Sequence, residues 1–185
     1  DQNGKHHKLS WYGDQKAVVI FVQGNGCQIV RNSVAELRAI RDQYAEQGVQ
    51  FFMLNPQSQD TRDSITAEAA ELGYDFPILI DETQLIAESL GVDRTSETFI
   101  INPETREVIY RGPIDDRLHY ETQKSVAQNH YLRDALDAYL AGRPGGENWA
   151  GNEKLRQYVQ REYERNHARI MGGRRSPAAS PASRR

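Results

Sequence analysis

The sequence is poor in cysteine, and the single thiol among its 185 residues belongs to Cys27. One cysteine excludes a disulfide within the chain, and it leaves the redox compartment of the protein undetermined. The sequence also has no apolar run that approaches the roughly 20 residues needed for a membrane-spanning helix. We therefore expect no transmembrane segment in this chain. It would then reach a membrane only through a partner or through an anchor preceding Asp1.

Charge is distributed unevenly along the chain, although the formal net charge is only −3. Residues 1–142 contain thirteen Lys/Arg and twenty-two Asp/Glu, a net charge of −9. Residues 143–185 contain ten Lys/Arg and four Asp/Glu, a net charge of +6. An acidic body with a basic tail is typical of a protein that carries an interaction arm.

The body of the chain alternates strand-like and helix-like segments. KAVVIFV (16–22) is a short apolar run, rich in β-branched residues, that predicts a strand buried on both faces. Apolar residues then recur at helical spacing over 27–47, and Gly48 stands at the C-cap position. We further predict strands at 49–54, 76–80, 97–101 and 108–111, a turn at 102–105, and helices at 60–72, 83–90 and 126–140. This order predicts an α/β domain over residues 1–141, with a mixed central β-sheet flanked by helices.

The remainder of the chain has a different composition. Residues 142–151 form a Gly/Pro hinge, 152–171 predict an exposed amphipathic helix, and 172–185 form a basic low-complexity arm. The helix is expected to contact a protein partner, because its apolar stripe has two tyrosines and lacks the Leu/Phe/Trp density of membrane-inserting helices. We expect no nucleic-acid partner, since aromatic residues are not interleaved with the arginines. The expected contacts to a partner come from Leu155, Tyr158, Val159, Tyr163, Ile170, Arg174 and Arg175.

Cys27 lies at the predicted junction between the first strand and the first helix. The unsatisfied amides and the dipole of a helix N-terminus stabilise a thiolate, which makes a thiol nucleophilic. Arg31, one helical turn later, would add a positive charge. The alternative is a purely structural role, in which Cys27 is a small buried hydrophobic residue, as free cysteines often are.

Three stretches resemble the thioredoxin-like superfamily, specifically its redoxin or alkyl hydroperoxide reductase/thiol-specific antioxidant branch. They are NGKHHKLSWYGDQKAVVIFVQGNGC (3–27), FPILIDETQLIAESLGV (76–92) and RTSETFIINPETREVIYRGPIDDR (94–117). The resemblance covers about residues 3–141 and implies a thioredoxin-like fold. It also implies redox chemistry at Cys27 and a loop at Thr95-Ser96 that faces the thiol.

Several positions differ from the patterns of that superfamily. A thioredoxin-type Cys-x-x-Cys motif would need a second cysteine at position 30, where the chain has Val30. Peroxiredoxins have a Thr or Ser where this chain has Gly24, with a Pro before it where this chain has Ile20. At Thr95-Ser96 relatives have Thr-Pro with a cis bond. A cis bond before a non-proline residue costs about 2.5–4 kcal/mol, so we predict a trans bond here.

The sequence gives little support for a nucleotide site, a metal site or a pair of catalytic carboxylates. Gly24-Asn25-Gly26 lacks the third glycine of a dinucleotide-binding loop, since position 29 is Ile. A copper site would need a second cysteine near the first, and we expect His6 and His7 to be surface residues. We interpret Asp81-Glu82 and Asp115-Asp116 as capping or solvated loop residues. No metal and no cofactor are expected.

Two hypotheses for the function remain. The differences at positions 24, 30 and 96 favour an accessory subunit that docks through residues 152–185 to a larger assembly, such as a membrane-bound electron-transfer complex. Retention of Cys27 favours the alternative, a single-thiol oxidoreductase or peroxidase with an external resolving thiol. On balance the sequence favours the accessory subunit. A periplasmic or exported location is expected, with a cytoplasmic one as the alternative.

Overall fold

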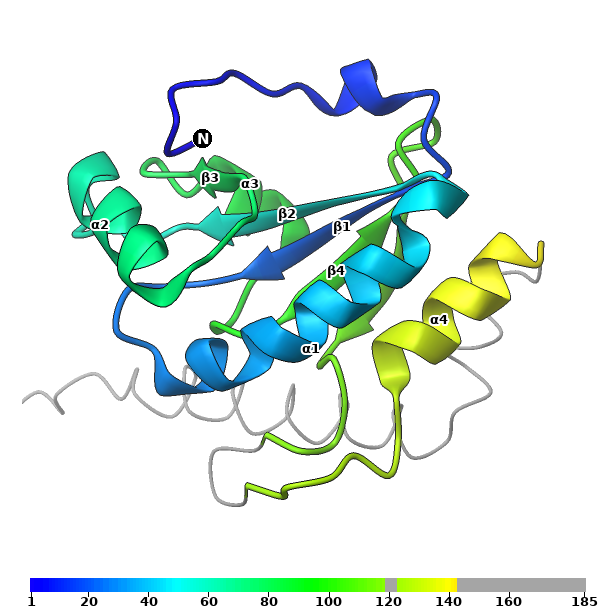
Figure 1. The fold of residues 1–185 in the computed structure, drawn as a ribbon. Helices are drawn as coiled ribbons and strands as arrows, with labels where there is room; N and C mark the ends of the chain where they lie inside the picture. Colours follow the sequence, from blue (N-terminus) through cyan, green and yellow to red (C-terminus); the bar gives the residue numbers. More distant parts are fainter. Residues whose placement is uncertain (119–122, 143–185) are drawn as a thin grey trace, which may run out of the picture.

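A five-stranded sheet forms the centre of the computed structural model, which describes residues 1–118 and 123–142 (Figure 1). Its strands lie in the order β3-β2-β1-β4-β5. The first three strands of the chain are parallel, whereas β4 is antiparallel to both β1 and β5. The strands are β1 (Ala17–Val22), β2 (Val49–Asn55), β3 (Ile78–Ile80), β4 (Thr98–Ile101) and β5 (Val108–Gly112).

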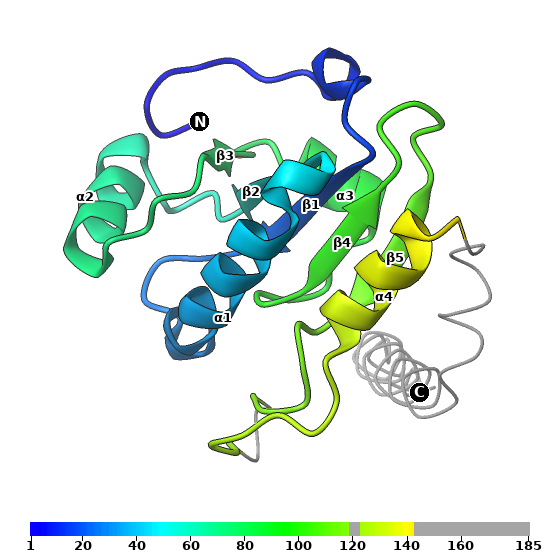
Figure 2. The ribbon, with the colours of Figure 1, turned by 45° about the vertical axis from the view of Figure 1, so that its right-hand side comes forward.

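Within residues 1–118 and 123–142, four α-helices flank the sheet. They are α1 (Gln28–Tyr44), α2 (Arg62–Leu72), α3 (Leu85–Leu90) and α4 (Tyr131–Leu140), with short 3-10 helices η1 (Leu9–Tyr12) and η2 (Ala45–Gln47). Figures 1 and 2 show α1 and α4 side by side across one face, with α3 on the other. The Tyr44 hydroxyl joins α1 to α4 by donating to the Asp137 carboxylate at 2.6 Å. The mixed sheet flanked by helices confirms the predicted thioredoxin-like fold.

Alternation along the strands divides the apolar core between the two faces of the sheet. Val19 and Phe21 of β1 belong to the core beneath α1, α2 and α4. Val18, Ile20 and Val22 belong to a second core, closed partly by η1 and α3. β1 is therefore buried on both faces along its whole length, as its continuous apolar run predicts.

The ends of the helices follow local sequence signals. Gly48 has a φ of 84° and closes the turn after α1, where a left-handed backbone favours glycine. Thr61 caps α2 in a reciprocal pair of hydrogen bonds with Ser64, which explains the start of that helix. α3 receives its cap from Asp81, whose carboxylate accepts the amide hydrogens of Ile86 and Ala87. Asp81 thus caps a helix, as the sequence indicates.

The last helix is shorter than predicted. α4 begins at Tyr131, whereas the sequence pattern predicts a start near residue 126. The backbone amides of Gln128 and Asn129 donate to the carboxylate of Asp116 at 2.8 and 3.1 Å, so these residues fold around a side chain and not into a helical turn. Asp115 and Asp116 were predicted to be capping or solvated loop residues. They do accept backbone amides of the loop, but they are only 5% and 8% exposed, so the solvated alternative is wrong.

His7 also differs from its prediction as a surface residue. Its side chain is 8% exposed, because one ring nitrogen contacts the Tyr12 hydroxyl at 2.6 Å and the other contacts the Asp1 carboxylate at 2.7 Å. His6 remains exposed, as expected.

The predicted hinge after residue 142, the amphipathic helix and the basic arm lie outside the described residues. So do all seven residues predicted to contact a partner, from Leu155 to Arg175. In the described part of the chain, no helix has the length and apolar character needed to cross a bilayer.

Candidate functional site around Cys27

Cys27 is the N-cap residue of α1. Its backbone is extended, with φ −74° and ψ 111°, and its carbonyl accepts the Arg31 amide at 3.1 Å. The side chain is half-buried and packs against the core beneath α1. The strand, glycine turn and helix therefore place the thiol at a helix N-terminus, where the first amides have no intrahelical acceptor.

Thr95 is the residue that meets the thiol. Its Oγ1 lies 3.3 Å from the Sγ of Cys27, although the two residues are 68 positions apart. Antiparallel pairing of β4 with β1 brings the loop before β4 to the carboxyl end of β1. The loop predicted to face the thiol does so.

Ser96 holds this loop in an uncommon backbone conformation. The described residues contain no cis peptide bond, so the predicted trans bond between Thr95 and Ser96 is confirmed. Ser96 has a φ of 65°, and its amide donates to the carbonyl of Val22 at 2.7 Å. A proline would lack this hydrogen and could not adopt this φ. The loop therefore depends on a residue other than proline at the position where relatives have proline.

Gly24 permits a close approach behind the thiol. A Cβ at this position would lie 3.2 Å from both the Gln57 Cγ and the Thr95 Cγ2. A side chain at position 24, such as the Thr or Ser of peroxiredoxins, would therefore crowd the loop that contacts Cys27.

Two carboxylates bind the turn that precedes Cys27. The amide of Asn25 donates to Asp60 at 2.9 Å, and the amide of Gly26 donates to both oxygens of Glu68, at 2.8 and 3.1 Å. Amides that could otherwise bind an anion beside the thiol are therefore occupied. Sequence analysis did not identify Asp60 or Glu68, because nothing local in the sequence links them to Cys27.

Arg31 points toward one of these carboxylates. Its Nη2 lies 3.9 Å from Glu68 Oε2, and the two side chains are 36% and 13% exposed. Part of the positive charge expected to favour a thiolate is thus shared with a neighbouring acid. The role of Arg31 toward the thiol remains a prediction.

Tyr74 is a further residue of the site that sequence analysis did not identify. Burial, followed by the negative charges of Glu68 and Cys27, raises the pKa of Tyr74 to about 12, and Arg31 opposes this shift. Within the described chain, neither its hydroxyl nor the Nε of Arg31 has a hydrogen-bond partner. The charges of Glu68 and Arg31 therefore act on Tyr74 in opposite directions.

Arg111 fixes the loop that carries Thr95 at both of its ends. Its Nε donates to Glu97 at 2.8 Å and its Nη2 to Asp93 at 2.6 Å. The carboxylate of Glu97 also accepts the Asp93 amide at 3.1 Å. This ion-pair network closes the loop into a compact unit, and so limits how far Thr95 can move from Cys27.

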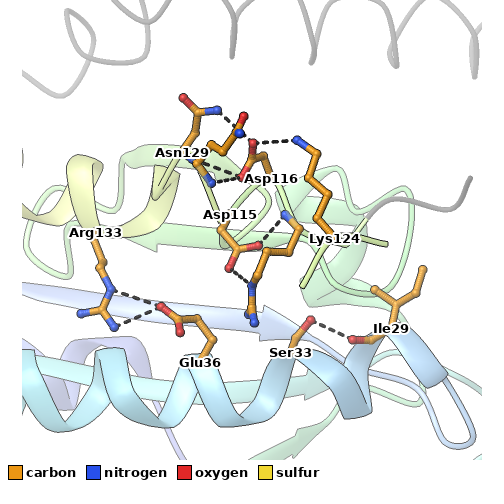
Figure 3. A network of polar contacts seen from close by, with 10 residues as sticks. Ile29, Ser33, Glu36, Asp115, Asp116, Lys124, Asn129 and Arg133 are labelled. Carbon is orange, nitrogen blue, oxygen red and sulfur yellow. Dashed lines mark hydrogen bonds and ion pairs between the residues drawn. The ribbon is translucent and has the colours of Figure 1, made fainter. Parts of the chain in front are cut away.

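A second polar network borders the N-terminal half of α1 (Figure 3). Lys124 and the Asn129 side chain both contact the Asp116 carboxylate, at 3.1 and 3.0 Å. Nearby, Arg133 of α4 binds Glu36 of α1 at 3.1 Å. No group of three or more His, Cys, Asp or Glu side chains within residues 1–118 and 123–142 is arranged to hold a metal ion.

Comparison with known proteins places this geometry in a family. Residues 1–110 match the family model described as AhpC/TSA. The chain belongs to the AhpC/TSA family. Its membership confirms the resemblance found in the sequence.

Solved structures share the AhpC/TSA fold with this chain. A hypothetical protein from Sinorhizobium meliloti is 28% identical, with TM-score 0.67, covering 77% of this chain and 79% of that one. An uncharacterized conserved protein from Geobacillus kaustophilus is 32% identical, with TM-score 0.61 and 70% of each chain covered. A cysteine-to-serine mutant of PrxQ from Xylella fastidiosa is 18% identical, with TM-score 0.51, covering 59% and 72%, and shows the fold alone. No curated protein matches the chain.

Proposed function

We propose that this chain is a thiol-dependent redox protein in which Cys27 acts as the single nucleophile and another molecule supplies the resolving thiol. The observation that carries the proposal is the contact of 3.3 Å between Cys27 Sγ and Thr95 Oγ1 at the N-terminus of α1. A hydroxyl that donates to the sulfur stabilises a thiolate, and the helix dipole acts in the same direction. Cys27 is half-buried, and its reaction with a small reactant is part of the proposal.

The reaction follows from a single thiol. The Cys27 thiolate attacks one oxygen of a hydroperoxide, the O–O bond breaks, and the alkoxide or hydroxide leaves and takes a proton from solvent. An external thiol then attacks the sulfenic acid, releasing water and forming a mixed disulfide. A second external thiol reduces Cys27 and leaves as part of a disulfide. A disulfide substrate enters the same cycle at the mixed-disulfide stage.

An external resolving thiol is required because the chain has no other cysteine. Val30, at the position of the second cysteine in a Cys-x-x-Cys motif, is fully buried in the core beneath α1. The valine therefore contributes to packing and leaves no room for an exposed resolving group at this position.

A second candidate function is the accessory subunit, and the carboxylates around the turn favour it. Asp60 and Glu68 accept the amide hydrogens of Asn25 and Gly26, so these amides cannot bind an anion beside Cys27. In this proposal the chain keeps the fold, lacks redox turnover, and docks to a larger assembly on the exported side through residues 152–185.

Oxidation of Cys27 separates the two candidates. The reduced chain is treated with hydrogen peroxide or with glutathione disulfide, and the modified cysteine is measured by mass spectrometry, with Cys27→Ser as the blank. The redox proposal requires stoichiometric sulfenic acid or mixed disulfide and its reversal by added thiol. An unreactive Cys27, together with loss of a native complex on deletion of residues 143–185, would instead establish the accessory subunit.

A further inference from the structure

Three side chains near the Cys27 site carry buried polar atoms that have no hydrogen-bond partner within the described residues. They are the Nε2 and Oε1 of Gln23, the Oγ of Ser96 and the Oγ1 of Thr98. Gln23 is 1% exposed and Thr98 is fully buried. A buried side-chain amide whose nitrogen and oxygen both lack a hydrogen-bond partner is rare in native proteins, and each such group requires an explanation.

Strand register brings these side chains together. The Gln23 amide donates to the Leu54 carbonyl at 2.8 Å, so pairing with β2 continues one residue beyond β1. On the other side, Phe21 pairs with Thr98, and the Ser96 amide donates to Val22. Gln23 therefore directly follows Val22, the residue that accepts the Ser96 amide, and lies two residues along the chain from Phe21, the partner of Thr98.

The side chains of Gln23 and Thr98 also face the same side of the sheet. Val19 and Phe21 point into the core beneath α1, and Gln23 follows at the next alternate position. Ile100 points into that core as well, and Thr98 precedes it by two residues. Cys27 packs against the same core. The unpaired atoms of Gln23 and Thr98 thus lie on the Cys27 side of the sheet, at the carboxyl end of β1.

We propose that Gln23, Ser96 and Thr98 enclose ordered water behind the Cys27–Thr95 pair, and that this water holds the Thr95–Ser96 loop in position. Buried water typically makes about three hydrogen bonds to polar groups that otherwise lack partners. The three side chains offer both donors and acceptors, so one or two water molecules can satisfy them. We call these amide and hydroxyl groups the polar cage. Residues that served only to pack the core would not need such polar groups.

The cage connects to the thiol through one peptide unit. Ser96 follows Thr95, whose hydroxyl contacts Cys27 Sγ at 3.3 Å. With the Ser96 amide bonded to Val22 and its hydroxyl bonded to the caged water, both polar groups of Ser96 hold the loop against β1. Gln23 and Thr98 are then positioning residues for the thiol chemistry. This part of the inference rests on the proposed redox function, whereas the water site does not.

The test uses the full chain and the variants Thr98→Val and Gln23→Met. Thr98→Val keeps the shape of the side chain. Whether it lowers or raises the urea midpoint therefore shows whether the water is present. If the water is present, valine removes one of its partners and the urea midpoint falls. If the hydroxyl has no partner, valine removes an unsatisfied buried group and the midpoint rises, which overturns the water site.

Water is detected directly as well. We expect a crystal structure of the Cys27→Ser chain to show ordered water within hydrogen-bonding distance of the Gln23 amide and the Thr98 hydroxyl. A dry, apolar contact at this place in well-resolved density would overturn the site. Because this measurement uses a chain without the thiol, its result does not depend on whether Cys27 is redox-active.

Alkylation of Cys27 by iodoacetamide tests the link to the thiol. We expect Thr98→Val and Gln23→Met to move the pH of half-maximal alkylation by about half a pH unit, roughly a threefold change in rate at fixed pH. The control is Ser33→Ala, which removes a buried hydroxyl that already bonds the Ile29 carbonyl at 2.8 Å. Unchanged profiles in both cage variants would overturn the positioning role.

Discussion

The Oγ1 of Thr95 lies 3.3 Å from the Sγ of Cys27, at the point where two distant parts of the chain meet. The sulfur is carried by the N-cap residue of α1, and the hydroxyl belongs to the loop before β4. A thiolate formed here has one hydroxyl donor and the helix N-terminus to stabilise it. The chemistry of the site therefore depends on how firmly the loop is held.

Replacement of Thr95 by Val should slow oxidation of Cys27 by hydrogen peroxide about tenfold, because a hydrogen bond to a charged group contributes about 1.5–3 kcal/mol. The rate is measured by stopped-flow kinetics on the reduced chain. Thr83→Val, at an exposed position, is the matched control and should leave the rate unchanged. Equal rates for Thr95→Val and the unmodified chain would show that the hydroxyl does not act on the sulfur.

The pair of variants Ser96→Pro and Ser96→Gly tests the backbone of the loop. Proline cannot adopt the φ of 65° and removes the bond from the Ser96 amide to Val22, so we expect a loss of about 3 kcal/mol. Glycine keeps that amide and tolerates the left-handed conformation, so its stability should stay within about 1 kcal/mol. Urea unfolding measures both. A proline variant as stable as the glycine variant would contradict this account of the loop.

Arg111→Met should destabilise the chain by about 2 kcal/mol, because Glu97 would remain as a buried carboxylate without its cation. It should also change the rate at which iodoacetamide alkylates Cys27, since the loop loses its closure. The comparison is Arg38→Met, whose partner Asp75 is half-exposed and whose ion pair contributes less than about 1 kcal/mol. Similar effects of the two variants on stability and alkylation would argue against a specific role for Arg111.

The Asp116 carboxylate predicts a pH dependence of stability. Burial acts to raise its pKa, but hydrogen bonds from the amides of Gln128 and Asn129, and then from Lys124, hold the pKa well below its usual range. A group with a lowered folded-state pKa contributes stability above its unfolded pKa of about 3.9, and this contribution is lost as pH falls further. Asp116→Asn should therefore cost about 2 kcal/mol at pH 7.

The same variant should approach the stability of the unmodified chain as pH falls from 5 to 2. Urea midpoints across this range provide the measurement. A difference between the two chains that stays constant with pH would show that the charge of Asp116 does not organise the segments 115–118 and 123–130.

The elements that position Cys27 could be predicted because their signals are local. An apolar run predicts β1, the Gly24-Asn25-Gly26 turn follows it, and helical spacing up to Gly48 predicts α1. The N-cap position of Cys27 follows from these three signals. The loop at Thr95 was found through the family resemblance, because no local pattern indicates that it contacts a residue 68 positions away.

The interactions that tune the site could not be predicted, since they join side chains to backbone atoms in other elements. Glu68 lies on α2 and binds the Gly26 amide, while Tyr74 follows α2, and burial and then the charge of Glu68 raise the pKa of this tyrosine. The sequence indicates only a capping or solvated loop residue at Asp116, because it does not show that the amides of Gln128 and Asn129 turn toward this carboxylate. His7 was likewise assigned to the surface because its partners belong to a segment without a regular pattern.

The central claim is that Cys27 is a nucleophile prepared by its surroundings. The second-order rate constant for its reaction with hydrogen peroxide, compared with that of free cysteine under the same conditions, tests this claim most directly. We predict a rate at least about tenfold higher, equivalent to ~1.4 kcal/mol of transition-state stabilisation. A rate equal to that of free cysteine, in a chain shown to be folded, would contradict the claim.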